Sequence, residues 1–164
     1  MRDGREQRLA GGTADLAVAA QAAHWFDLES YYREVRRVLR PGGAVALVTY
    51  GNVRLDEQFE PLLESYREMI ASYWPPERRC VEEGYRSLPF PFRELETPAL
   101  QMEADWPLDR FIGYLQTSSA IQAMLREQGR APMRDFRRRL AAAWGRAGAP
   151  RSVQWPLTLR AGRV

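Results

Sequence analysis

The segment 15–51 constrains the fold of this chain more than any other part of its sequence. Residues 15–20 are a short, unbroken apolar run, which is typical of a strand buried on both faces of a parallel sheet. Residues 28–39 carry apolar side chains at helical spacing, and the Pro-Gly-Gly run at 41–43 predicts the end of that helix. Residues 44–50 are a second apolar run, rich in valine, and predict a second strand. Strand, helix and strand at this spacing predict a parallel βαβ unit with a right-handed crossover, and therefore an α/β fold.

The remainder of the chain alternates between helical and strand patterns. An apolar stripe at helical spacing over residues 59–73 predicts a helix, and two or three further helices are predicted between 108 and 144. Apolar and polar residues alternate over 100–106 and 153–161, which predicts two half-buried strands. Residues 77–98 mix charged, aromatic and proline residues, so we expect an ordered loop with a helical turn there.

Length and composition favour one globular domain. The 164 residues suffice for a substantial core, and because we find no repeat or linker we expect a single domain over 1–164. No apolar run reaches the roughly 18 residues of a membrane span, so a membrane partner is not expected. The first residues lack the apolar core of a secretory signal, so we expect a cytoplasmic protein.

The charged and metal-binding residue types exclude further classes of site. The net charge is +3, and arginine supplies all the positively charged side chains, which are spread among acidic residues, so a nucleic-acid partner is not expected. The densest arginine cluster, at 134–139, is predicted to be the solvated face of a helix. The single cysteine, Cys80, cannot form an internal disulfide, and a single histidine, His24, cannot build a multi-histidine metal site, so we expect no bound metal.

Several motifs together carry a resemblance to a known family. The run QAAHWFD at 21–27, followed by REVRRVLRPGGAVAL, resembles the fourth-strand and fifth-strand region of class I methyltransferases that use S-adenosylmethionine (SAM). The distal half resembles the C-terminal region of the trans-aconitate methyltransferase-like subgroup, through the runs YWPPERRCVEEGYRSLPFPF, GYLQTSSA, AAAWGRAG and VQWPLTLRAGR. The resemblance covers nearly all of residues 13–164.

The resemblance implies a partial doubly wound, Rossmann-like sheet. The family's strand order is 3-2-1-4-5-7-6, and by resemblance residues 15–20 are strand four, 44–50 strand five, 99–106 strand six and 152–162 an antiparallel strand seven. Strands one to three have no counterpart in this sequence, so we expect strands 4-5-7-6 with covering helices. The strand at 15–20 would then lie at a sheet edge, and we expect a homo-oligomer, such as a dimer, or a partner chain to pair there.

The family resemblance also implies SAM as the cofactor. The family holds SAM with a glycine-rich turn that follows its first strand and opens a helix, as dinucleotide-binding folds do. Neither Gly11-Gly12 nor Gly42-Gly43 stands in that context, so SAM binding by this chain alone is not expected. Ala20 and Gln21, at the end of the strand at 15–20, are the predicted cofactor contacts, and Gln21 can also orient the substrate.

The substrate side of the site is predicted beyond the carboxyl ends of the strands, where ligands bind in open α/β sheets. We expect His24 to donate a hydrogen bond to a carboxylate, Trp25 to wall the pocket and Tyr50 to end the second strand at the same edge. The resemblance adds Arg86, which can pair with a carboxylate, and Tyr114. The alternative for each is structural: His24 and Trp25 pack a strand–helix junction, Tyr50 is a core-edge residue, Arg86 lies on the surface and Tyr114 caps a helix.

No catalytic acid or base is predicted. Methyl transfer from SAM depends mainly on positioning the acceptor, and a carboxylate acceptor is already ionised at neutral pH. The resemblance favours a methyltransferase that acts on a small, for example carboxylate-bearing, molecule. This chain would be its C-terminal part and inactive by itself. Two alternatives stay open: a non-catalytic methyltransferase-like module that binds or dimerises, and one half of a split enzyme.

Overall fold

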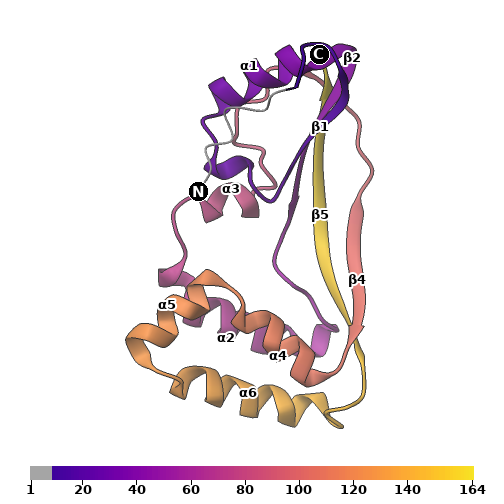
Figure 1. Cartoon of the computed structure of the whole chain (residues 1–164). Helices are drawn as coiled ribbons and strands as arrows, with labels where there is room; N and C mark the ends of the chain where they lie inside the picture. The colour runs from indigo at the N-terminus through magenta and orange to yellow at the C-terminus, as the bar shows by residue number, and fades with distance from the viewer. Residues whose placement is uncertain (1–8) are drawn as a thin grey trace. The chain divides into compact units, whose positions relative to one another are not determined.

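The computed structural model describes residues 9–164 (Figure 1). Two compact units share the chain. The first contains the described residues up to 51 together with 77–100 and 156–164, and the second contains 52–76 and 101–155. The long strand β5 (Arg151–Arg163) contributes residues to both units.

The first unit is built on the predicted βαβ element. Strand β1 (Ala14–Ala20) leads through the short 3-10 helix η1 (Ala23–Trp25) to helix α1 (Leu28–Val38), and β2 (Leu39–Tyr50) follows. β1 pairs with β2 in parallel, so the predicted unit is confirmed.

The first helix ends before the predicted Pro-Gly-Gly stop. The helix ends at Val38, and Pro41, Gly42 and Gly43 lie inside β2 rather than after the helix. A residue that precedes proline disfavours the helical region, so Arg40 is already extended. The β1–β2 register shifts next to this segment, and Gly42 takes a positive φ of 78°, as a bulge in a strand allows.

The sheet has the expected strand order. β2 pairs antiparallel with β5, and β5 also pairs with β4 (Leu100–Trp106) and, antiparallel, with β3 (Arg93–Leu95). The neighbours β1, β2, β5 and β4 reproduce the order 4-5-7-6 with an antiparallel third member, so the predicted α/β fold class is confirmed. β3 falls in the segment that was predicted as a loop, and all three of its residues are exposed, so no apolar pattern marks it.

One face of β1 is packed and the other is open among the described residues. Ala17 and Ala19 contact core clusters that include Val35 of α1 and Tyr85. In Figure 1, α1 and the short helix α3 (Arg78–Glu82) lie on this packed side. The opposite face carries Leu16 and Val18, which are 55% and 53% exposed. The prediction that this strand is buried on both faces is therefore wrong for residues 9–164, because a run rich in alanine shows no alternation to separate the two cases.

The second unit is mainly helical. Its helices are η2 (Glu57–Phe59), α2 (Glu60–Ile70), η3 (Ala71–Tyr73), α4 (Leu108–Gln116), α5 (Ser119–Gln128) and α6 (Ala131–Trp144). The three helices α4 to α6 confirm the predicted helical region. The rings of Phe59, Phe111 and Trp144 are buried in this unit, and the Phe111 and Trp144 rings stack with centroids 5.7 Å apart. Across residues 9–164, no helix is long and apolar enough to cross a membrane.

Candidate functional site

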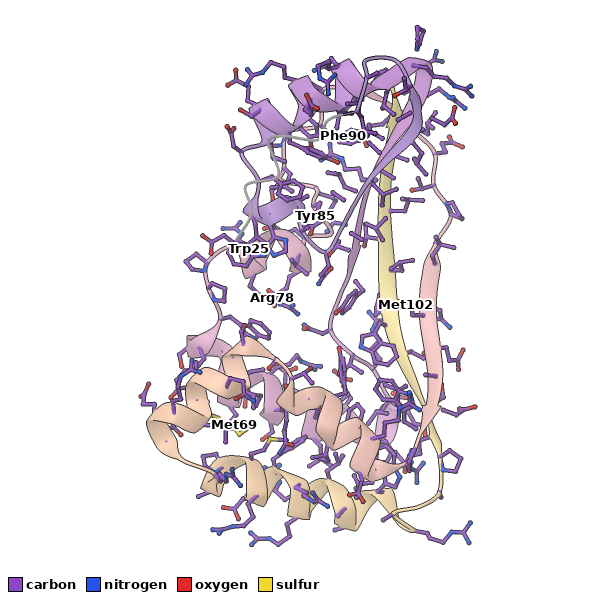
Figure 2. The ribbon with its side chains drawn as sticks, in the orientation of Figure 1. Trp25, Met69, Arg78, Tyr85, Phe90 and Met102 are labelled. Carbon is purple, nitrogen blue, oxygen red and sulfur yellow. The ribbon has the colours of Figure 1, made fainter. Side chains whose placement is uncertain are left out.

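The candidate site lies at the carboxyl ends of β1 and β2 in the first unit. Parallel neighbours end at the same sheet edge, where ligands of α/β proteins bind. Figure 2 shows Trp25, Arg78 and Tyr85 close to one another beside this edge. The chain leaves β1 at Gln21 in a left-handed conformation, with a φ of 51°, which is uncommon for a residue other than glycine.

Gln21 joins the two strand ends. Its backbone N–H donates to the Val48 carbonyl at 2.7 Å. Its side-chain Oε1 accepts from the Thr49 hydroxyl at 2.7 Å and from the Tyr50 backbone N–H at 3.1 Å. A backbone N–H can only donate, so this contact fixes the amide with its oxygen toward Tyr50. Gln21 can therefore offer only its amide NH2 group to a ligand. The preceding residue, Ala20, is exposed.

His24 sits in η1, next to the end of β1. Its Nδ1 lies 2.8 Å from the Tyr85 hydroxyl oxygen, and its ring centroid lies 4.7 Å from that of Trp25. Burial lowers the pKa of His24, and the nearby Arg78 cation lowers that pKa further, against an opposing effect of Glu77. His24 is therefore neutral at neutral pH, with one ring nitrogen held by Tyr85.

Tyr85 has an unusual backbone. It is fully buried and left-handed, with a φ of 61°, directly after Gly84, which is also left-handed. Such a conformation in a non-glycine residue costs on the order of 1–3 kcal/mol. The fold holds it through the Tyr85 N–H, which donates to Cys80, and the Tyr85 carbonyl, which accepts from Arg160. Burial raises the pKa of Tyr85, so its hydroxyl keeps its proton.

An aromatic ring and a cation complete the site. Trp25 is 57% exposed although its neighbour His24 is partly buried, so its indole can contact a ligand. Arg78 begins α3, and its side chain is only 16% exposed and lies 3.4 Å from Glu82. Since Arg78 lowers the pKa of His24, its positive charge acts directly on the site. A cation, a neutral imidazole and an exposed indole together suit an anionic group on a small molecule.

The structure brings four of the predicted site residues together. Gln21, His24, Trp25 and Tyr50 lie at the two strand ends, as described above. Arg86 follows Tyr85 but is exposed, and its backbone N–H donates to Glu83.

Tyr114 belongs to the second unit, where its role is visible. Its hydroxyl accepts from the indole N–H of Trp155 at 2.7 Å, within a cluster of rings that includes Trp106. Its neighbours there are those of a packed core residue.

Three residues of the candidate site were not predicted from the sequence. Thr49 is buried to 1% exposure near the end of an apolar strand, and that single polar position was an available signal. Tyr85, rather than the neighbouring Arg86, contacts His24. Arg78 lies in the YWPPER run, just after the proline pair, but the position of its charge depends on the fold of α3. In residues 9–164, no group of acidic, histidine or cysteine side chains could hold a metal ion.

Three comparisons with known proteins agree on one family. A family model described as a methyltransferase domain matches residues 2–47. A solved structure of a "putative type II methyltransferase" from Anaeromyxobacter dehalogenans is 48% identical, with a TM-score of 0.89. The alignment covers 95% of this chain and 67% of that chain.

A curated relative agrees. A "putative methyltransferase" of Dictyostelium discoideum is 26% identical over 140 residues, which is 83% of this chain and 53% of that protein. The chain therefore spans about half the length of that relative.

Proposed function

The chain belongs to the class I SAM-dependent methyltransferases, and we propose that its protein transfers the methyl group of SAM to a small carboxylate-bearing molecule. In this proposal the described residues form the acceptor side of the site. SAM supplies a methyl group that is already activated by its sulfonium, so the protein's main contribution is to position the acceptor.

One arrangement supports the proposal: the His24 and Trp25 rings lie together at the carboxyl end of β1, and Arg78 is near enough to lower the pKa of His24. Arg78 can pair with a carboxylate through two parallel N–H donors. The neutral imidazole of His24 can add one hydrogen bond without adding a second charge. The exposed Trp25 ring can cover the acceptor and exclude water.

The chemistry of a carboxylate acceptor matches the residues that are present. A carboxylic acid is ionised at neutral pH, so its oxygen attacks a methyl group without a general base. An in-line attack requires the carboxylate to be held in one orientation. Among residues 9–164, the cluster of His24, Trp25 and Arg78 offers groups suited to that orientation.

The fit of the described residues to SAM itself is partial. In the part of the chain that the structure describes, Gly12 precedes β1 and Gly42 and Gly43 lie inside β2, so no glycine pair follows a strand and opens a helix. The contacts that residues 9–164 offer to SAM are the backbone around Ala20 and the amide NH2 group of Gln21. We assign to this segment a boundary of the SAM site, and no step of the transfer is routed through it.

An acceptor screen tests the proposal. Protein and methyl-labelled SAM are incubated with small dicarboxylic and tricarboxylic acids and with the matching amides, and products are identified by mass spectrometry. We expect methyl esters of the acids and no methylation of the amides. Methylation of amines or phenols without any of the acids would contradict the carboxylate assignment.

A second role follows from the exposed side of β1. We propose that β1 pairs with a strand of a second copy or of another chain, because it ends the described sheet order and carries Leu16 and Val18 exposed. We expect Val18→Glu to reduce self-association, measured by light scattering, while Leu95→Glu on β3, at another exposed apolar residue, leaves it unchanged. A wild-type monomer at high concentration, with no partner strand bound, would contradict this role.

A further inference from the structure

The contact between Tyr85 and His24 joins two segments that are 61 positions apart in the sequence. Both ends of the contact are held firmly. Tyr85 is fully buried in a left-handed backbone conformation, and His24 follows the other left-handed residue, Gln21. The described residues contain only these two left-handed residues other than glycine, and strained backbone of this kind is concentrated at functional sites.

The proton between Tyr85 and His24 has a direction that can be worked out from their neighbours. The backbone N–H groups of Ala23 and His24 lie near enough to the Tyr85 hydroxyl to lower its pKa, against the larger effect of burial. A neutral phenol is a stronger hydrogen-bond donor than a neutral imidazole, and an imidazole nitrogen is the stronger acceptor, so the Tyr85 O–H is the favoured donor.

Two acceptors compete for that proton. The Thr49 hydroxyl also lies near enough to affect the pKa of Tyr85, and since its own proton goes to Oε1 of Gln21, only its oxygen is available as an acceptor. The imidazole nitrogen of His24 is the stronger acceptor of the two, and it lies 2.8 Å from the Tyr85 oxygen. The Tyr85 O–H therefore donates to Nδ1 of His24.

We propose that Tyr85 is a positioning residue that holds neutral His24 as the Nε2–H tautomer, with that N–H available to the methyl acceptor. The Nδ1 lone pair is occupied by Tyr85, so the proton of the neutral ring must sit on Nε2. The ring is partly exposed, and the exposed Trp25 lies against it. The tautomer assignment stands on its own, whereas the use of Nε2–H toward an acceptor carboxylate rests on the proposed function.

The charged and titratable groups around His24 agree with this arrangement. The Arg78 cation disfavours a second positive charge on His24, whereas the Glu77 carboxylate favours one. Tyr85 keeps its proton. Gln21 and Thr49 are polar but do not titrate near neutral pH. A neutral imidazole that donates from Nε2 adds a directional contact beside the Arg78 cation.

The single histidine of the chain makes the tautomer directly measurable. The probe is the untagged protein labelled with 15N in the imidazole ring, so that every imidazole signal belongs to His24. We expect a protonated Nε2 and an unprotonated, hydrogen-bonded Nδ1 at pH above the His24 transition. A protonated Nδ1 in the wild-type protein would overturn the proposal.

The variant Tyr85→Phe tests whether the phenol is responsible, with Tyr31→Phe as its matched control. Tyr31 lies in the same core cluster and its pKa is raised by burial alone. A donor to Nδ1 stabilises the neutral ring, so its loss in Tyr85→Phe should raise the pKa of His24, while Tyr31→Phe leaves it unchanged. A lower pKa of His24 in Tyr85→Phe would mean that His24 donates to Tyr85 and would contradict the proposal.

Ligand-binding measurements separate the positioning role of Tyr85 from the proposed function. The probes are succinate and succinamide, titrated into wild type, Tyr85→Phe and Tyr31→Phe. We expect succinate affinity to fall about tenfold in Tyr85→Phe alone, because one hydrogen bond to a charged group loses its orientation. If the tautomer and pKa results hold but succinate binds no better than succinamide, the positioning role stands and the carboxylate function fails. Equal succinate affinity in all three proteins would overturn the role of Tyr85 toward the acceptor.

Discussion

Each unit of the molecule contains a tyrosine hydroxyl that is hydrogen-bonded to a ring nitrogen. The oxygen–nitrogen distances are nearly the same, but the chemistry of the two pairs differs. In the first unit the Tyr85 oxygen lies 2.8 Å from Nδ1 of His24, and in the second the Tyr114 oxygen lies 2.7 Å from Nε1 of Trp155. The indole N–H can only donate, so the second pair has one direction and does not titrate. The imidazole can donate or accept and can gain a proton, so the surroundings of the first pair determine the tautomer and the protonation state of His24.

The surroundings of the two pairs differ in the same sense. Tyr114 has a regular helical backbone and is enclosed by the rings of Trp106 and Trp155, as expected of a packing residue. Tyr85 has a strained, left-handed backbone. Its partner His24 packs against the exposed indole of Trp25, and the Arg78 cation lowers the pKa of His24. Hydrogen-bond geometry alone therefore does not distinguish the two pairs, whereas strain, exposure and an adjustable protonation state make the Tyr85–His24 pair the candidate for function.

The largest expected effect is a loss of stability when the Tyr114–Trp155 pair of the second unit is disrupted. Trp155→Ala removes a ring that is 5% exposed and packs against Trp106 and Tyr114, so we expect a loss of about 3–5 kcal/mol in the free energy of unfolding. Chemical denaturation measures that loss. At low denaturant the pKa of His24 should stay at its wild-type value, and a shift in that pKa would show that the two pairs are coupled.

The next effect concerns the cation of the first unit. Arg78→Gln should weaken binding of the acceptor carboxylate by about 10- to 100-fold, because hydrogen bonds to a charged group are lost. The same change should raise the pKa of His24, since Arg78 lowers it. Calorimetry and NMR titration measure the two results.

The neighbouring arginine provides the control for that variant. Arg79 has a side chain that is 83% exposed and pairs with Glu83, so Arg79→Gln should change neither carboxylate affinity nor the pKa of His24. Equal losses of affinity in both variants would mean that the general positive charge of α3, rather than Arg78, attracts the carboxylate.

A smaller effect is expected from the phenol of the second unit. Tyr114→Phe leaves the Trp155 N–H without its acceptor, so we expect a loss of about 1 kcal/mol in the free energy of unfolding. Affinity for the acceptor should not change. A large loss of acceptor affinity in Tyr114→Phe, measured by calorimetry, would instead support Tyr114 as a substrate contact.

The smallest effect is a pH dependence of stability. The pKa of folded His24 lies below its usual value of 6.5, so the unfolded chain binds more protons just below that pH. The contribution of His24 to stability is therefore complete above pH 6.5 and is lost as the pH falls through the lower pKa of the folded state. Urea denaturation should show this decline in wild type and a flatter profile in His24→Asn, and identical profiles would contradict it.

The elements of the fold could be predicted wherever the sequence carries a clear period. The βαβ unit and the helices α4 to α6 follow from apolar spacing. β3 could not be predicted, because three exposed residues carry no pattern. The open face of β1 could not be predicted either, because an alanine-rich run looks the same whether one face or both are covered.

The site could be predicted only in part. Gln21 and His24 could be predicted directly from their place after an apolar strand. The partner of His24 could not be read from the sequence, because it depends on a left-handed tyrosine in a segment that forms no strand or long helix. Arg86 was the residue favoured there by charge, yet the fold turns Tyr85 inward and leaves Arg86 exposed.

The most direct measurement follows the imidazole N–H of His24 while a carboxylate is added. In the untagged, 15N-labelled protein, succinate should shift the Nε2–H signal and slow its exchange with water, and succinamide at the same concentration should not. This result would tie the tautomer set by Tyr85 to recognition of an acceptor carboxylate. An Nε2–H signal that ignores succinate, or responds equally to succinamide, would contradict that link.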